Sequence, residues 1–458
     1  MTAVAVAPSR SLNLTIAATS LGFVLVQLDV SIVNVALPRI ATALDADVHG
    51  LQWVVDAYTI AFAALLLSAG ALGDRLGARR AYVGGFALFI LASIGCGLAP
   101  DVPALIAARA VQGIGAALLV PCSLSLLTHA CGDDPAARGR AISLWTAAAS
   151  VALAAGPILG GILVDRAGWR SIFLVNVPIG LAGIGLTRRF VAESPRRDGG
   201  VDLPGQALAL LTLSCLTGSV IEAGRLGPGA PLVLAGAALA LAGGVGFALV
   251  ERRTENPMLP LAFFRNRTFC AATLVGLLIN LTVYGVIFGL GLYLQQVQGY
   301  SPLLSGLAFL PFAIALGLAN VGAGRIGGRF GLQGPMASGL VVAAAGYWLL
   351  RPLDAGTPYA DLLPGLVLVP AGIGLAVPLM TTALLATVPR SHSGIASGIL
   401  NTVRQTGGAV GVALYGALLG GAGFPGIRAV FETSAALLAA AALIAALGIR
   451  SGAGGRDD

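Results

Sequence analysis

The sequence predicts an all-α integral membrane protein of about 14 transmembrane helices, and three observations lead to that prediction. Hydrophobic residues make up 57% of the 458-residue chain and charged residues 10%, whereas a soluble domain carries roughly 25% charged residues. Apolar runs long enough to cross a bilayer, about 20 residues each, recur along the whole chain. The basic residues, all arginine, gather in short segments between these runs. Lipid is therefore the expected solvent, and the charge pattern argues against a nucleic-acid partner.

Each apolar run is interpreted as one membrane span, beginning with the run from Leu12 to Leu37. That first run is too long for the core of a signal peptide, so it is interpreted as the first span. The expected spans cover residues 12–36, 51–73, 81–99, 103–130, 140–164, 169–190, 204–224, 230–250, 268–296, 304–324, 335–351, 361–388, 394–419 and 428–449. An even number of spans places both termini on one side of the membrane.

The placement of arginine predicts which side that is. Six loops and the two tails on one side hold 19 arginines, and the opposite loops hold six. Cytoplasmic loops carry the excess of basic residues, so both termini are expected in the cytoplasm of a bacterial cell. The arginine-rich loops are residues 74–80, 131–140, 188–202, 251–267, 325–329 and 389–393.

Two parts of the chain resemble each other at a nearly constant offset. The matches are residues 73–77 with 327–331, offset by 254, Ala141 and Gly156 with Ala396 and Gly411, offset by 255, and residues 113–115 with 372–374, offset by 259. The repeat predicts two six-helix halves with an extra pair of helices between them. Parallel repeats of this kind place the substrate site near mid-membrane, where the halves meet. The expected divisions are 1–11 (tail), 12–190 (first bundle), 191–267 (two-helix insert with linkers), 268–450 (second bundle) and 451–458 (tail).

Five segments, each on the expected span or loop, resemble motifs of the major facilitator superfamily and, within it, of the 14-span drug:proton antiporters. They are LDVSIVNVALP at 28–38, GALGDRLGARR at 70–80, the set Arg109, Gln112, Gly113 and Gly115, GPILGG at 156–161, and Trp169-Arg170 with Phe173 and Asn176-Val177-Pro178. The resemblance covers nearly the whole chain. It implies the major facilitator fold and a proton-coupled antiporter that exports small amphiphilic drugs or antibiotics by alternating access. The match at 156–161 is the motif that favours export over uptake.

Other classes of function remain as alternatives. A dedicated exporter of one endogenous metabolite and an uptake symporter both fit the same fold. A membrane-embedded enzyme needs carboxylates, histidines or cysteines clustered at one membrane face, and the sequence offers no such cluster. Protons are the expected coupling ion, with no other cofactor and no metal. The expected partners are a small-molecule substrate and membrane lipids, and the chain is expected to work as a monomer.

Three charged residues are the candidates for proton coupling: Asp29, Asp56 and Arg109. Counting 1.5 Å per helical residue places all three at similar depth in the outer half of the membrane. Since an unpaired charge there is costly, we expect them to face each other or a wet cavity. The hypothesis is that Asp29 binds the proton and that Arg109 modulates the affinity of Asp29 for it. Asp56 would be a second proton-binding carboxylate. The alternatives are a static Asp29–Arg109 ion pair and a purely structural Asp56.

Two further segments are candidates for conformational roles. The loop Asp74–Arg80 is expected to act as a cytoplasmic latch, or else to fix topology through its positive charge. Its candidate residues are Gly70, Gly73, Asp74, Arg75, Gly77, Arg79 and Arg80. In the fifth span, Gly156, Pro157, Gly160 and Gly161 predict a bend and close helix packing, which either gates the cavity or only packs the bundle.

Polar residues within spans are the candidates for contacting substrate. They are Asn34, Gln112, Asn280, Tyr284, Asn320, Asn401, Arg404 and Gln405. Such residues also hold helices together, so each has a structural alternative. The five expected spans between residues 268 and 419 contain no carboxylate apart from Asp361 at a span end. This absence favours neutral, zwitterionic or anionic substrates, although Asp29 and Asp56 leave a cationic one open.

Overall fold

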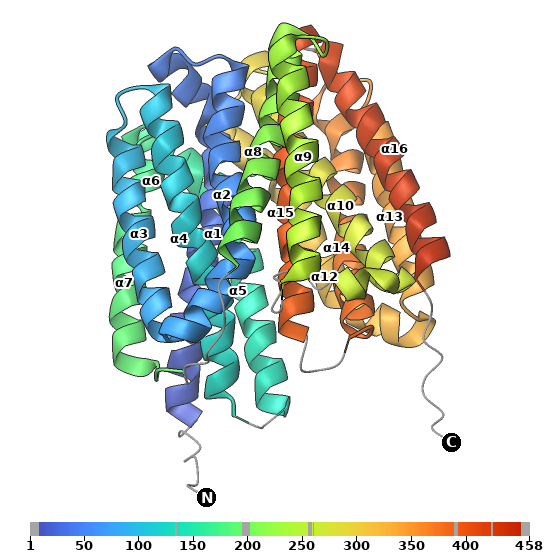
Figure 1. Ribbon diagram of the computed structural model, residues 1–458. Helices are drawn as coiled ribbons and strands as arrows, with labels where there is room; N and C mark the ends of the chain where they lie inside the picture. The colour runs from blue at the N-terminus through green and yellow to red at the C-terminus, as the bar shows by residue number, and fades with distance from the viewer. Residues whose placement is uncertain are drawn as a thin grey trace, which may run out of the picture. The chain divides into compact units, whose positions relative to one another are not determined.

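The computed structural model describes residues 9–132, 135–194, 202–254, 259, 261–354, 356–388, 393–422 and 425–449. Within these ranges the chain is helical and forms no strand (Figure 1). The α-helices are α1 (Ser9–Leu44), α2 (Val48–Leu76), α3 (Ala78–Leu98), α4 (Val102–Ala130), α5 (Pro135–Ala167), α6 (Ser171–Leu174), α7 (Asn176–Phe190), α8 (Leu203–Leu226), α9 (Pro231–Arg253), α10 (Arg267–Leu292), α11 (Pro302–Ala308), α12 (Leu310–Phe330), α13 (Gln333–Leu349), α14 (Tyr359–Leu385), α15 (Ser393–Ala422) and α16 (Pro425–Gly448). The short segments η1 (Leu261–Arg265) and η2 (Tyr293–Val297) flank α10.

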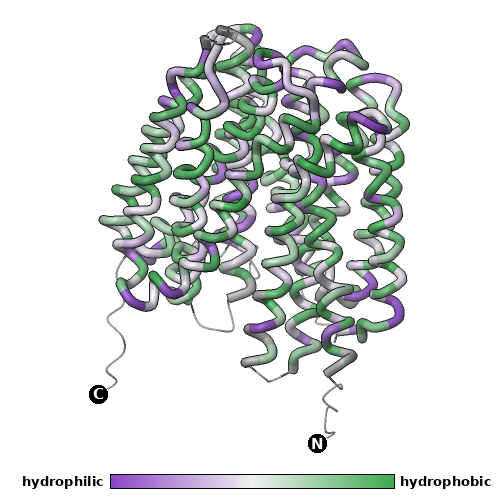
Figure 2. Tube along the Cα trace, turned by 180° about the vertical axis from the view of Figure 1, so that it is seen from behind, coloured by the Kyte–Doolittle hydropathy of each residue, from purple (hydrophilic) through white to green (hydrophobic). Residues whose placement is uncertain are grey.

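Each expected span coincides with a helix or with consecutive helices. Eleven helical segments in the described part of the chain are long and apolar enough to cross a membrane. The helices α2, α13 and α15 occupy the other three expected spans, so the count of 14 stays a prediction. Hydrophobic residues run along the helices, and hydrophilic ones gather mainly toward their ends (Figure 2). This pattern fits helices in lipid, which satisfy their backbone polar groups internally.

The helices α8 and α9 are the least buried of these segments. In their most apolar stretches, 11% of α8 and 17% of α9 is buried, compared with 72% of the first span. Large side chains on α9, among them Leu232, Leu234 and Leu241, are exposed. Since an apolar surface of this extent is unfavourable in water, the exposed faces of α8 and α9 are suited to contact with lipid.

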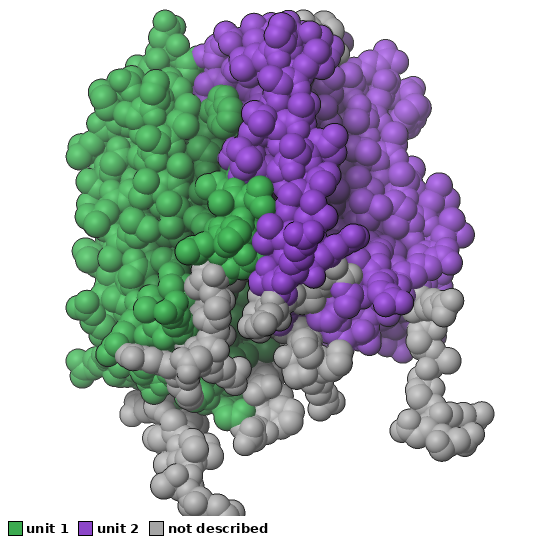
Figure 3. Space-filling view, viewed as in Figure 1, with its two compact units in different colours: residues 1–46, 53–210, 301–306 green, residues 47–52, 211–300, 307–458 purple. Residues whose placement is uncertain are grey.

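The chain divides into two compact units (Figure 3). Unit 1 comprises residues 1–46, 53–210 and 301–306, and unit 2 comprises residues 47–52, 211–300 and 307–458. The expected division into two bundles and a separate two-helix insert stays a prediction.

The internal repeat is visible in the way each unit packs. In unit 1, α1 packs on α5, α3 packs on α4, and α7 contacts both α1 and α3. In unit 2, α10 packs on α15, α13 packs on α14, and α16 contacts both α10 and α13. The helices of the two sets correspond in chain order, so both units use the same pairing of helices.

Local sequence explains where two helices, α4 and α10, begin. Asp101 caps α4 by accepting a hydrogen bond from the Ala104 amide at 2.8 Å. Asn266 caps α10 in the same way, with its side-chain oxygen 2.9 Å from the Thr268 nitrogen. Such caps satisfy amides that have no partner inside the helix.

Candidate functional site

A buried polar cluster lies in the interior of unit 1, where α1, α3, α4 and α7 bring five side chains together. These are Asp29, Ser93, Arg109, Gln112 and Asn176. Arg109 is 1% exposed and the other four are fully buried. The cluster joins Asp29 and Arg109, two of the three charges that the sequence placed at similar depth.

The carboxylate of Asp29 is fully engaged in this cluster. Its Oδ2 accepts a hydrogen bond from Arg109 Nη1 at 2.5 Å. Its Oδ1 accepts one from Gln112 Nε2 at 2.8 Å and one from Asn176 Nδ2 at 2.9 Å. A buried charge needs this degree of pairing, because the loss of hydration is otherwise uncompensated.

Arg109 has partners in addition to Asp29. Its Nε donates to the Val54 carbonyl at 3.1 Å, and its Nη1 donates to Gln112 Oε1 at 2.7 Å. The guanidinium carbon lies 4.2 Å from the centre of the Tyr58 ring, a cation–π geometry. Arg109 therefore retains three favourable contacts even when the charge of Asp29 is removed.

Asp56 does not join the cluster. Its side chain is fully buried in α2, and neither carboxyl oxygen has a hydrogen-bond partner among the described residues. Asp29 and Arg109 therefore face each other, which is one of the two expected arrangements, and Asp56 does not pair with either of them. The role of each in proton coupling stays a hypothesis.

Close packing of small residues surrounds the GPILGG segment of α5. A β-carbon at Gly160 would lie 2.8 Å from a γ-carbon of Ile32 on α1, and one at Gly156 would overlap the Ser31 hydroxyl. On another side of α5, a β-carbon at Gly161 would lie 2.5 Å from Leu303 Cα, at the start of α11. A larger residue at these positions would force α1 or the start of α11 to shift, and whether the segment gates the cavity stays a hypothesis.

The loop between α2 and α3 is held by the segment that follows α7. Glu193 accepts a hydrogen bond from the Arg79 amide at 2.9 Å, and Ser194 accepts one from the Ala78 amide at 3.0 Å. Glu193 also lies 3.8 Å from Arg80 Nε. These two residues cap the start of α3. The Asp74 side chain lies outside the described residues.

Glycines give this loop its shape. Gly77 has φ of 98°, and a β-carbon there would meet the Glu193 carboxylate at 2.7 Å. Gly73 packs against α4, where a β-carbon would lie 2.6 Å from the Cys122 sulfur, while Gly70 has ordinary space beside Pro121. Arg75 is exposed.

We expect Glu193→Ala to lower the stability of the protein by about 1 kcal/mol, because it removes a cap and a favourable charge at the start of α3. Thermal unfolding of the purified protein in detergent measures the change as a lower midpoint. Glu432→Ala is the matched control, since it removes a carboxylate whose pair with Arg428 is largely exposed and worth little. An equal effect of the two variants would contradict the capping role.

The candidate substrate-contacting residues fall into different surroundings. Gln112 is buried in the Asp29 cluster, and Asn34 donates to the Val30 carbonyl of its own helix at 2.9 Å. Asn320, Asn401 and Gln405 are partly buried. In unit 2, Arg404 Nε donates to Asn280 Oδ1 at 3.3 Å, and Tyr284 lies on α10 one turn beyond Asn280.

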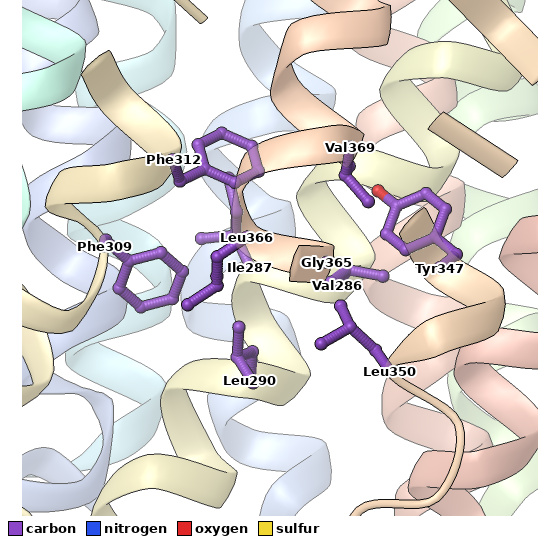
Figure 4. Close-up of a pocket in the computed structure, with 10 residues that line it drawn as sticks. All are labelled: Val286, Ile287, Leu290, Phe309, Phe312, Tyr347, Leu350, Gly365, Leu366 and Val369. Carbon is purple, nitrogen blue, oxygen red and sulfur yellow. The ribbon is translucent and has the colours of Figure 1, made fainter. Parts of the chain in front are cut away.

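An apolar crevice lies in unit 2 among α10, α12, α13 and α14 (Figure 4). Its wall includes Leu290, Phe312, Tyr347 and Leu366. The volume of about 10 Å³ is no more than one water needs. This crevice is therefore too small for a drug-sized molecule, since pockets for such ligands measure about 300 Å³ or more.

Three residues in or beside the buried cluster were not among the candidates predicted from the sequence. Ser93 accepts hydrogen bonds from Gln112 at 2.9 Å and Asn176 at 3.3 Å, and Tyr58 faces Arg109. Asn176 had a signal in the sixth-span motif. Ser93 and Tyr58 had none beyond being polar residues in apolar helices.

The repeated bundles and the buried charges together define a membrane transporter. Residues 19–412 match the Major Facilitator Superfamily, and the chain belongs to that family. The fold agrees, because a xylose transporter from E. coli superposes with a TM-score of 0.68 at 16% sequence identity, covering 97% of each chain.

Relatives of known name are more similar in sequence. A methylenomycin A resistance protein of Streptomyces coelicolor is 39% identical over 404 residues, covering 88% of this chain and 85% of the relative. A tetracenomycin C resistance and export protein of Streptomyces glaucescens is 35% identical over 413 residues, covering 88% and 75%.

Proposed function

We propose that this chain is a proton-coupled antiporter that exports small amphiphilic drugs or antibiotics across the cytoplasmic membrane by alternating access. The similarity to relatives named for resistance and for export, over most of the chain, carries the proposal. The buried Asp29–Arg109 pair supports the coupling to protons, since ionisable residues inside transporters commonly form proton relays.

The partners of Arg109 suggest how a proton is exchanged. A proton on Asp29 removes the counter-charge of Arg109, which keeps the Val54 carbonyl, Gln112 and the Tyr58 ring. The cluster thus has one arrangement with the pair charged and another with Asp29 neutral. A conformational change that moves α1 relative to α4 would favour one of these two arrangements over the other. Because the arrangements differ by one proton, the movement couples proton binding to the transport cycle.

Asp56 is proposed as a second site of proton exchange. A buried carboxyl without donors has no fixed partner to stabilise its charge. Its proton is exchanged only when the surroundings change, and an alternating-access cycle provides such a change. Asp29 remains the main site in this proposal, because it lies in the same cluster as Arg109.

Drug susceptibility tests the proposed function. We expect a sensitive bacterial host that expresses the chain to tolerate several-fold more of at least one amphiphilic antibiotic than the empty host. A protonophore that collapses the proton gradient should abolish accumulation differences between the two hosts. Unchanged susceptibility to a broad panel would contradict drug export and favour the dedicated metabolite exporter.

An uptake symporter is the second alternative on this fold. Everted membrane vesicles distinguish the two directions, because an antiporter accumulates substrate in such vesicles as protons leave them. Proton-driven accumulation in right-side-out vesicles would instead support uptake.

The proposed function also includes the orientation of the chain in the membrane, its oligomeric state and its coupling ion. We propose that both termini lie in the cytoplasm of a bacterial cell, which the excess of arginine in the corresponding loops supports. We propose that the chain works as a monomer in lipid, with protons as its coupling ion and no other cofactor.

A further inference from the structure

Unit 2 contains an interior arginine without a carboxylate. Arg404 lies on α15, which packs against α10. Its Nε donates to Asn280 at 3.3 Å, and this is the one hydrogen bond that its side chain makes among the described residues. A guanidinium has five N–H donors, so most of its capacity is unused. Between residues 267 and 422 the acidic residues are Asp354 and Asp361, at a loop and a helix start.

The contrast with Arg109 shows what Arg404 lacks. Arg109 is 1% exposed and is neutralised by Asp29 at 2.5 Å. Arg404 is only partly buried, so part of its side chain is accessible. A cation in a membrane interior is costly without a counter-charge. An anionic ligand would supply that charge.

Besides Asn280, apolar and aromatic side chains lie near Arg404. Its aliphatic stem passes Gly276, where a β-carbon would lie 3.1 Å from Arg404 Cγ and 3.3 Å from the Met380 sulfur. The Tyr284 ring lies against Gly408, one helical turn along α15 from Arg404, with ring carbons 3.3 Å from a β-carbon placed there. A fixed cation beside an aromatic ring and a thioether suits a ligand with one anionic end and an apolar body.

We propose that Arg404, held by Asn280, binds the carboxylate of an anionic or zwitterionic amphiphile, whose apolar body packs against Tyr284. The inference rests on the proposed function only in taking this ligand to be the exported molecule. A carboxylate fits because it can accept two parallel hydrogen bonds from a guanidinium.

Equilibrium binding to the purified chain in lipid nanodiscs tests the proposal without any transport. The probe is tritiated 1-naphthylacetate, and the competitor is 1-naphthylacetamide, its neutral amide of the same shape. We expect the carboxylate to bind at least about tenfold more tightly than the amide, a difference of one charge-assisted contact. Arg404→Gln should remove that preference and leave amide binding unchanged.

Two further variants sharpen the test. Arg404→Lys keeps the charge without the planar pair of donors, so carboxylate affinity should fall at least about threefold. Arg428→Gln removes the same charge from an exposed position at the start of α16 and should change nothing. If Arg404→Gln does not fold, Arg404→Lys decides the question, and unchanged carboxylate binding in it overturns the proposal.

Other outcomes separate this inference from the proposed function. Equal affinity of the wild type for the two compounds, or a preference that survives Arg404→Gln, overturns the anion site. A charge preference in a chain that protects against no antibiotic overturns drug export and leaves the site standing. Protection against an antibiotic without a charge preference supports drug export and overturns the anion site.

Discussion

Asp29→Asn is expected to reduce proton-driven export by about 100-fold or more, because it removes the group proposed to bind the coupling ion. Asparagine matches the shape of aspartate and can still accept hydrogen bonds from Gln112 and Asn176. The asparagine side chain cannot bind and release a proton at the pH at which the transporter works. The measurement is substrate accumulation in everted vesicles under an imposed proton gradient, at equal amounts of protein.

The single variant also leaves Arg109 as a buried cation without a counter-charge, which costs about 3–5 kcal/mol when a buried pair is broken. Loss of transport by Asp29→Asn alone therefore does not separate coupling from stability. The double variant Asp29→Asn with Arg109→Gln removes both charges and that penalty.

The double variant distinguishes the two roles of the pair. If Asp29 and Arg109 form only a static ion pair, the neutral pair should restore folding and proton-driven export together. If Asp29 carries the proton, the double variant should fold, with a normal unfolding midpoint, and still fail to export against a gradient. Restored export would overturn the assignment of Asp29.

Asp56→Asn completes this comparison. Its carboxyl oxygens have no hydrogen-bond partner among the described residues, so the substitution breaks no bond that the structure records. A change in transport would then reflect proton exchange, whereas normal transport would leave Asp56 with the structural role.

The fold was predictable because few backbone structures are stable in lipid. An apolar run of about 20 residues must satisfy its backbone within a helix, so each expected span fell on a helix. The repeat seen at offsets of 254–259 residues reappears as a repeated pairing of helices. The depth of Asp29 and Arg109 could be counted along their helices, and the two residues meet.

The remaining contacts depend on tertiary packing, which counting along helices does not give. Ser93 and Gln112 are neutral, and such residues in spans more often join helices than form a charged site. Glu193 lies in a linker, more than 100 residues from the loop it caps. Rotation about the helix axis decides whether Asp56 joins the cluster, and depth alone says nothing about it.

The contact between α5 and the start of α11 gives the second large effect. At Gly161 a β-carbon would lie 2.5 Å from Leu303 Cα and 2.8 Å from the Pro302 carbonyl oxygen. Both are backbone atoms, which cannot rotate away as a side chain can. We expect Gly161→Ala to force these segments apart and to reduce export by about tenfold or more, while insertion into the membrane is retained.

Gly185→Ala on α7 is the matched control, because no heavy atom lies within 4 Å of a β-carbon there. Alanine should be tolerated at that site, since it favours a helix by about 1 kcal/mol over glycine. Export in everted vesicles and the unfolding midpoint are measured for both variants. A role in gating requires Gly161→Ala to lose export with little change in the midpoint. Equal losses of export and stability would leave ordinary packing as the explanation, and normal export by Gly161→Ala would contradict both.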